Sequence, residues 1–90
     1  MDTIYHDQEN CCFRTPDGAV LSYTVKDGRY LLDHTEVPEA LRGQGIAAKL
    51  ARVALDHARD ENWKIVPACS FIERYIQRYP EYAGLVVDGY

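Results

Sequence analysis

Apolar and polar residues alternate in the first half of the chain. Every second position from 19 to 25 carries an apolar side chain, namely Ala19, Leu21, Tyr23 and Val25. This period of two is typical of a strand with one buried face. The dipeptides Asp17-Gly18 and Asp27-Gly28 flank the strand and readily adopt the positive φ of hairpin turns. We therefore predict neighbouring strands at about residues 10–14 and from Arg29 to Val37, where Pro38 ends the pairing.

The apolar spacing becomes helical in the second half of the chain. From Gly45 to about Glu61, apolar residues recur at the spacing of a helix face, opposite charged ones: Ile46, Leu50, Val53, Ala54 and Ala58. The next apolar segment, Trp63–Pro67, is too brief for a helix and predicts a strand. A second helix is predicted from Ser70, which can cap it, to Arg78, before Pro80 stops it.

The predicted order of elements is β-β-β-α-β-α, which places the chain in the α/β (α+β) class. Because a helix connects the third and fourth strands, those two strands should be parallel and their crossover right-handed. We expect a mixed sheet with antiparallel N-terminal hairpins, covered by the two helices. Residues 1–90 are expected to form a single domain, with residues 1–9 and 87–90 as loose termini.

Composition narrows the classes of function. The 90 residues carry a formal net charge of −4 and 47% of them are apolar, which suits one packed domain. The lack of a basic surplus argues against a nucleic-acid partner, and no apolar run reaches the roughly 18 residues of a membrane span. The N-terminus lacks the pattern of a signal peptide, so we expect a cytoplasmic protein. We expect it to be a monomer or a weak homodimer. Three cysteines favour reduced thiols over disulfides, and the three histidines show no ligand spacing, so no metal is expected.

The segment between the third strand and the first helix is rich in glycine. Arg42-Gly43-Gln44-Gly45-Ile46-Ala47 offers consecutive backbone N–H groups, with no bulky side chain at either glycine. At the N-terminus of a helix such donors are unpaired and lie at the positive end of the helix dipole. A phosphate or pyrophosphate therefore fits this turn. The alternative is a loop that uses glycine only to turn from a strand into a helix.

These residues resemble a known family. Arg42-x-x-Gly45-x-Ala47 is similar to the Gln/Arg-x-x-Gly-x-Gly/Ala signature of the GNAT superfamily of acetyl-CoA-dependent N-acetyltransferases, and it has the same place between a strand and a long helix. Three further segments resemble the very short single-domain members of that superfamily: His34–Pro38, Pro67–Phe71 and Tyr79–Tyr82. The resemblance covers about residues 10–86 and implies a minimal GNAT fold.

The resemblance also implies a cofactor, acetyl-CoA, and the residues that hold it. In this family the strand before the signature and the strand after the helix splay apart, and the pantetheine arm lies in the gap. Glu36 and Val37 would border that arm. The pyrophosphate would be held by the backbone N–H groups of Arg42, Gly43, Gln44, Gly45, Ile46 and Ala47. Lys49 would reach a phosphate oxygen or else lie as a solvated lysine on the helix, and Ser70 completes the expected cofactor-binding residues.

Cys69 and His34 are the candidate catalytic residues. Cys69 precedes a helix, whose dipole favours a thiolate at its N-terminus, and the resemblance implies a position near the thioester. Three roles are open for Cys69: it lines the site, it carries the acetyl group as an intermediate, or it is a buried structural cysteine. His34 is a candidate base, because histidine changes charge close to neutral pH; the alternative is a strand histidine bonded to its neighbours.

The sequence therefore favours an N-acetyltransferase-like enzyme. It would transfer acetyl from acetyl-CoA to an unidentified amine: a protein lysine, a protein N-terminus or a small amine. The alternative is a non-catalytic module that binds CoA or acyl-CoA. The parts that shape the acceptor pocket in longer family members have no counterpart in these 90 residues. An open site of that kind suits an extended protein substrate better than a metabolite.

Overall fold

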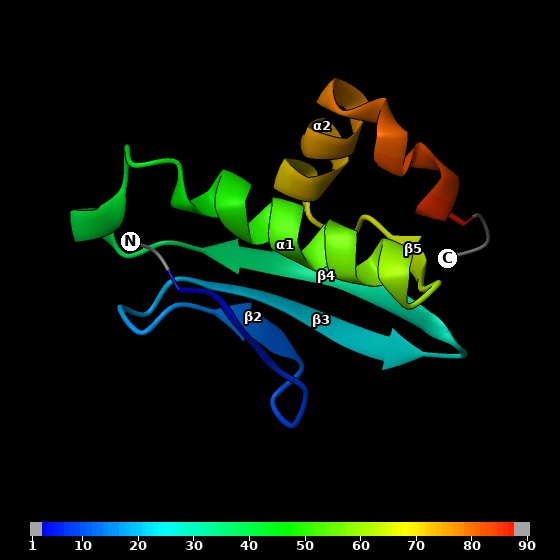
Figure 1. The fold of residues 1–90 in the computed structure, drawn as a ribbon, viewed down its shortest axis with the longest axis horizontal. Helices are drawn as coiled ribbons and strands as arrows, with labels where there is room; N and C mark the ends of the chain where they lie inside the picture. Colours follow the sequence, from blue (N-terminus) through cyan, green and yellow to red (C-terminus); the bar gives the residue numbers. More distant parts are fainter. Residues whose placement is uncertain (1–2, 88–90) are drawn as a thin grey trace.

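A computed structural model of the chain describes residues 3–87 and contains one sheet in the order β1-β2-β3-β4-β5 (Figure 1). The strands are β1 (Tyr5–Asp7), β2 (Cys12–Arg14), β3 (Val20–Lys26), β4 (Arg29–Glu36) and β5 (Lys64–Val66). Helix α1 (Ile46–Asp60) connects β4 to β5, and α2 (Ser70–Arg78) follows β5. Two short 3-10 helices complete the fold, η1 (Glu39–Leu41) and η2 (Pro80–Leu85). Among the described residues, no helix has both the length and the apolar character needed to cross a membrane.

The strand directions confirm the predicted mixed sheet. β1 to β4 pair antiparallel with their neighbours, whereas β4 and β5 are parallel because α1 carries the chain back across the sheet. The second helix occupies Ser70–Arg78, as predicted. Its N-cap, however, is Cys69 and not Ser70, and no side chain caps the helix. Pro80 ends α2 as expected, but the chain then continues as η2.

The N-terminal segment corrects a prediction. Residues 1–9 were expected to be loose, yet residues 5–7 form the edge strand β1 and pair with β2. Its central residue, His6, stacks on Phe13 with ring centroids 4.2 Å apart, and its Nε2 lies 2.7 Å from the hydroxyl of Tyr23. A strand this short shows no alternation in the sequence, and tertiary contacts alone stabilise it. The predicted loose tail at residues 88–90 lies outside the described residues.

The core lies between one face of the sheet and the helices. The buried residues of α1 and α2, such as Leu50, Leu55 and Ile72, belong to the same cluster as Phe13 and Leu21 of the sheet. At the edge of this cluster the rings of Tyr30 and Trp63 stack with centroids 3.8 Å apart. We call this side of the sheet the helix face.

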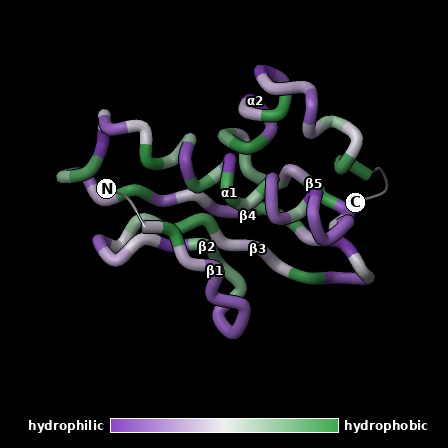
Figure 2. Tube along the Cα trace, viewed as in Figure 1, coloured by the Kyte–Doolittle hydropathy of each residue, from purple (hydrophilic) through white to green (hydrophobic). Residues whose placement is uncertain are grey.

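The opposite side of the sheet, which we call the open face, is mostly exposed. Residues that pair across strands share a face, so Ser22 and its partner His34 lie opposite Leu21 and its partner Thr35. Exposed residues of the open face include Tyr5, Arg14, Thr24, Lys26, Asp33, His34, Glu36 and Lys64. The hydropathy colouring shows hydrophilic residues at the hairpin between β3 and β4 (Figure 2). The exposed parts of this face, at the hairpin end and at the end of β4, are accessible to a partner.

Candidate functional site

Strands β4 and β5 separate halfway along β4. Their pairing ends at Leu31 and Val66, while β4 continues to Glu36 with only β3 beside it. The register between β3 and β4 shifts at this point: Tyr23 pairs with Leu32 and Ser22 with His34, so Asp33 is an extra residue. Such a bulge bends its strand. The bend explains why β4 leaves β5, and it opens a gap along the edge of residues 32–36.

The glycine turn lies at the same end of the sheet as this gap. Gly43 and Gly45 have φ of 84° and 74°, in the left-handed region that other residues rarely adopt. Gly45 is the N-cap of α1; no side chain caps that helix, and its first turn contains no acidic residue. The N–H of Arg42 already donates to the carbonyl of Glu39 at 3.2 Å, so the donors of the turn begin at Gly43. Within residues 3–87, the turn therefore presents N–H groups without a partner and no negative charge, which suits a phosphate.

A cavity of about 310 Å³ lies beside the glycine turn. Six of the predicted cofactor residues line it: Val37, Arg42, Gly43, Gly45, Ile46 and Ala47. The remaining lining residues are Leu41, Ala48 and Phe71. Glu36, Gln44, Lys49 and Ser70 do not line this cavity. The structure thus gathers most of the predicted set and adds Phe71.

A second cavity of about 290 Å³ continues from the first along α1 and α2. The two cavities share Ala48 and Phe71. The other lining residues of the second cavity are Arg74, Tyr75, Arg78 and Tyr79, all from the region of α2. One groove therefore runs from the glycine turn between the two helices, apolar and aromatic on its floor and basic along α2.

Cys69 lies across the gap from β4. Its Sγ is 3.8 Å from Oγ1 of Thr35, and the thiol is half-buried. Thr35 belongs to the part of β4 that has left β5, so this contact spans the gap on the helix face. Sequence reasoning missed Thr35. The alternation of the strand was the available signal, because it turns Thr35 inward between His34 and Glu36, whose side chains point outward.

His34 lies on the open face, with Glu36. Its Nε2 is 3.2 Å from Oε2 of Glu36, and the two side chains are 58% and 65% exposed. Because His34 and Thr35 point to opposite sides of β4, His34 and Cys69 do not meet as a nucleophile and base. The two predicted catalytic residues instead border the gap from opposite faces of the sheet.

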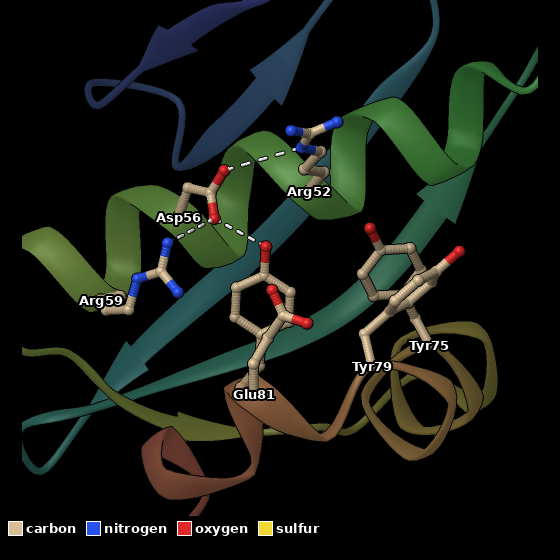
Figure 3. Close-up of a pocket in the computed structure, with 7 residues that line it drawn as sticks. Arg52, Asp56, Arg59, Tyr75, Tyr79 and Glu81 are labelled. Atoms are coloured by element: carbon tan, nitrogen blue, oxygen red, sulfur yellow. Dashed lines mark hydrogen bonds and ion pairs between the residues drawn. The ribbon is translucent and has the colours of Figure 1, made fainter.

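A third cavity, of about 320 Å³, lies farther along α1, and some of the residues that line it form ion pairs with one another (Figure 3). Asp56 is its centre: Oδ1 accepts hydrogen bonds from the Tyr82 hydroxyl at 2.6 Å and from Arg59 at 3.2 Å. Arg52 Nε approaches Oδ2 at 4.0 Å. Burial, followed by the hydrogen bond to Asp56, raises the pKa of Tyr82 to about 12. These contacts join η2 to α1.

Comparisons with known proteins identify the family of this chain. The sequence profile of the GCN5-related N-acetyl-transferase family matches residues 12–85. The chain is 45% identical over 65 residues to the protein NATD1 of Gallus gallus and of Mus musculus, a match that covers 71% of this chain and 59% of each relative. It thus spans less than two thirds of the length of these relatives.

A solved structure shows the same fold. The NMR solution structure of a GCN5-like protein from Staphylococcus aureus superposes with a TM-score of 0.73 and 28% identity, over 98% of this chain and 90% of that one. The family profile spans both the gap between the strands and the glycine turn. The chain belongs to the GCN5-related N-acetyltransferase family.

Proposed function

We propose that this protein transfers an acetyl group from acetyl-CoA to an amine. The observation that carries the proposal is the position of the gap: β4 leaves β5 at the end of the sheet where the glycine turn begins α1. One long ligand with phosphates at one end and an extended arm at the other fits both features. CoA is such a ligand, and its acetyl form supplies a reactive thioester.

The glycine turn would hold the phosphates. Its donors run from Gly43 to Ala47, and a Cβ built on Gly43 or Gly45 would meet nothing within 4 Å. That open space lets an anion approach the backbone. Lys49, one turn into α1, is exposed and adds a positive charge on that side. The nucleotide end would lie in the groove beyond, where an adenine ring can stack on aromatic residues and Arg74 and Arg78 can meet a phosphate.

The free edge of β4 would hold the extended arm. Residues 32–36 have a strand partner only on the β3 side, so their other edge can bond to an amide-containing chain as a further strand would. Glu36 and Val37, at the end of this edge, would border the arm. Ser70, exposed at the first position of α2, would lie on the far side of the gap.

The reacting groups would lie on the two sides of β4. His34 would accept a proton from the acceptor amine at Nδ1, while its Nε2–H donates to Glu36, which orients the ring. The amine nitrogen then forms a bond to the acetyl carbon and the carbon–sulfur bond breaks. Cys69, on the helix face, would give a proton to the departing sulfur. Because His34 and Cys69 are apart, direct attack by the amine fits better than a covalent acetyl-cysteine, which would need a base beside the thiol.

Binding and turnover test the proposal separately. Acetyl-CoA and CoA should both raise the melting temperature, since each binds only the native state. Release of CoA should then follow in the presence of one class within a panel of peptides and small amines. No thermal shift at millimolar ligand would refute any role for CoA. A shift with no turnover across the panel would instead support the alternative, a module that binds CoA without catalysis.

A further inference from the structure

Three cations lie side by side on the open face of the sheet. Lys26 of β3 pairs with Arg29 of β4, and Arg29 pairs in turn with Lys64 of β5. Paired residues share a face, and neighbouring strands are about 4.8 Å apart, so the three lie within about 10 Å. We call these three residues the basic row. It occupies the hairpin end of the sheet, opposite the end that carries the glycine turn.

The basic row carries no compensating charge in the described part of the chain. None of the three side chains forms an ion pair or hydrogen bond there, and the nearby acids Asp27 and Asp33 form no ion pair with them. Like charges directly opposite one another in a sheet are destabilising. The chain as a whole has a net charge of −4, so an excess of basic residues does not explain why three cations lie together. Local rules are broken most often where a surface has a function.

The row is aligned with His34 along the same face. From Arg29 to His34 the strand rises about 15 Å, which an extended peptide spans with about four or five residues. Between them lie Leu31 and Val66, which are 5% and 6% exposed and carry no charge. The open face is thus basic at one end and carries His34 and Glu36 at the other, and between them the exposed Asp33 accepts a hydrogen bond from Thr24 at 2.7 Å.

We propose that the open face docks an extended polypeptide with an acidic residue about four or five positions from the acceptor lysine. The acid would lie on the basic row while the lysine side chain reaches the gap beside His34. This inference rests on the proposed acetyltransferase function and names its substrate class. A nucleic acid fits less well, because its continuous negative charge would also meet Asp27, Asp33 and Glu36.

Direct binding tests the docking without the chemistry. A labelled lysine peptide with glutamate on either side of the lysine, at the spacing above, is compared by fluorescence anisotropy with the same peptide carrying glutamine. No acetyl-CoA is present. At least one glutamate peptide should bind about two- to fivefold tighter, as expected for exposed ion pairs, and the advantage should shrink in high salt. Equal binding of all these peptides would overturn the proposal.

Matched variants locate the binding surface. Lys64→Gln should remove most of that advantage, whereas Arg52→Gln, which removes an exposed cation from the helix side, should not. Equal effects of the two variants would mean that net charge alone attracts the peptide, and would overturn the proposal. The double variant Lys26→Glu with Lys64→Glu should instead prefer a peptide with lysine at the glutamate position. If that preference does not reverse, the basic row is not the binding surface.

Stability and turnover complete the test. Lys64→Gln should melt at or above the temperature of the parent protein, because it relieves repulsion, so loss of binding cannot come from unfolding. A lower melting temperature would contradict the claim that the row is strained. Turnover of small amines without selective peptide docking would refute this inference and leave the proposed function. Docking without any turnover would refute the proposed function and leave the docking surface.

Discussion

The thiol of Cys69 lies 3.8 Å from the hydroxyl of Thr35, although 34 positions separate the two residues in the sequence. One residue precedes α2, and the other belongs to the part of β4 that has left β5. Their contact spans the gap between the strands on the helix face. It is therefore the point at which a thioester held along β4 would meet a side chain able to give a proton.

Replacing Cys69 should lower turnover more than it lowers ligand affinity. Cys69→Ala should reduce kcat by about a hundredfold or more if the thiol protonates the leaving sulfur. Thr35→Val, which removes the hydroxyl but keeps the shape, should have a smaller effect of the same kind. CoA release measured over a range of acetyl-CoA concentrations separates kcat from KM. Cys11→Ser, at a half-buried thiol in the β1–β2 turn, is the control and should leave both constants unchanged.

The glycine turn should show strain and binding effects that can be separated. Gly45→Ala and Gly28→Ala both place a Cβ at a positive φ, 74° and 76°, with nothing within 4 Å. Each should cost about 1 kcal/mol of stability. Only Gly45→Ala should weaken CoA binding, because Gly28 lies in the distant β3–β4 hairpin. Thermal melts and titration calorimetry measure the two effects. Equal loss of CoA affinity in both variants would remove the turn from the binding site.

The hydrogen bond between Tyr82 and Asp56 should contribute to stability. Tyr82 is 3% exposed and donates to a carboxylate, so Tyr82→Phe should cost about 1.5–3 kcal/mol. Tyr79→Phe is the control: that ring is 38% exposed, its hydroxyl has no hydrogen bond within residues 3–87, and the change should stay within about 0.5 kcal/mol. Denaturant titration measures both. Similar losses of stability in the two variants would show that the hydrogen bond from Tyr82 to Asp56 does not contribute to the free energy of unfolding.

Alkaline pH should weaken the same contact. The pKa of Tyr82 is raised to about 12, so the folded protein retains this proton when the unfolded chain loses it near pH 10. The contribution of Tyr82 is therefore complete below about pH 10 and decreases as the pH rises towards about 12. The stability difference between the parent protein and Tyr82→Phe should narrow over that range. If this stability difference changes between pH 9 and 11 by no more than the extrapolation error, the raised pKa of Tyr82 is contradicted.

Acid should destabilise the packing of β1. Burial, followed by the nearby His57, lowers the pKa of His6 below its usual value, while Asp7 acts in the opposite direction. The unfolded chain therefore takes up this proton first, so the contribution of neutral His6 is complete above about pH 6.5 and is lost as the pH falls below it. Trp63 fluorescence reports on this cluster because its ring lies 5.7 Å from that of His6.

A histidine variant isolates that effect. Between about pH 7.5 and 5.5, His6→Phe should lose less stability than the parent protein, since it has no proton to take up there. If His6→Phe and the parent protein show the same slope, the acid sensitivity arises elsewhere.

Strong local patterns made most of the fold predictable. The alternation around Leu21 and the helical spacing before Glu61 each extend far enough to define an element, and proline marks two of the ends. Strand β1 was not predictable, because three residues show no period; His6 is held by Phe13 and Tyr23, which are remote in the sequence. The predicted N-cap of α2 was wrong by one residue, because the backbone conformation of a single residue is not visible in a sequence pattern. Ser70 has a good capping side chain, but the backbone of Cys69 is the one that is extended.

The sequence by itself determined the fold class, the glycine turn and the family, because these depend on residue types at fixed short spacings along the chain. Only the tertiary structure decided which residues meet. It paired Cys69 with Thr35, separated His34 from Cys69, and aligned the basic row across three strands. The physical reason is the bulge at Asp33. One extra residue in β4 ends its pairing with β5 and sets which side chains face the gap, and no local pattern in the sequence reports the register between strands.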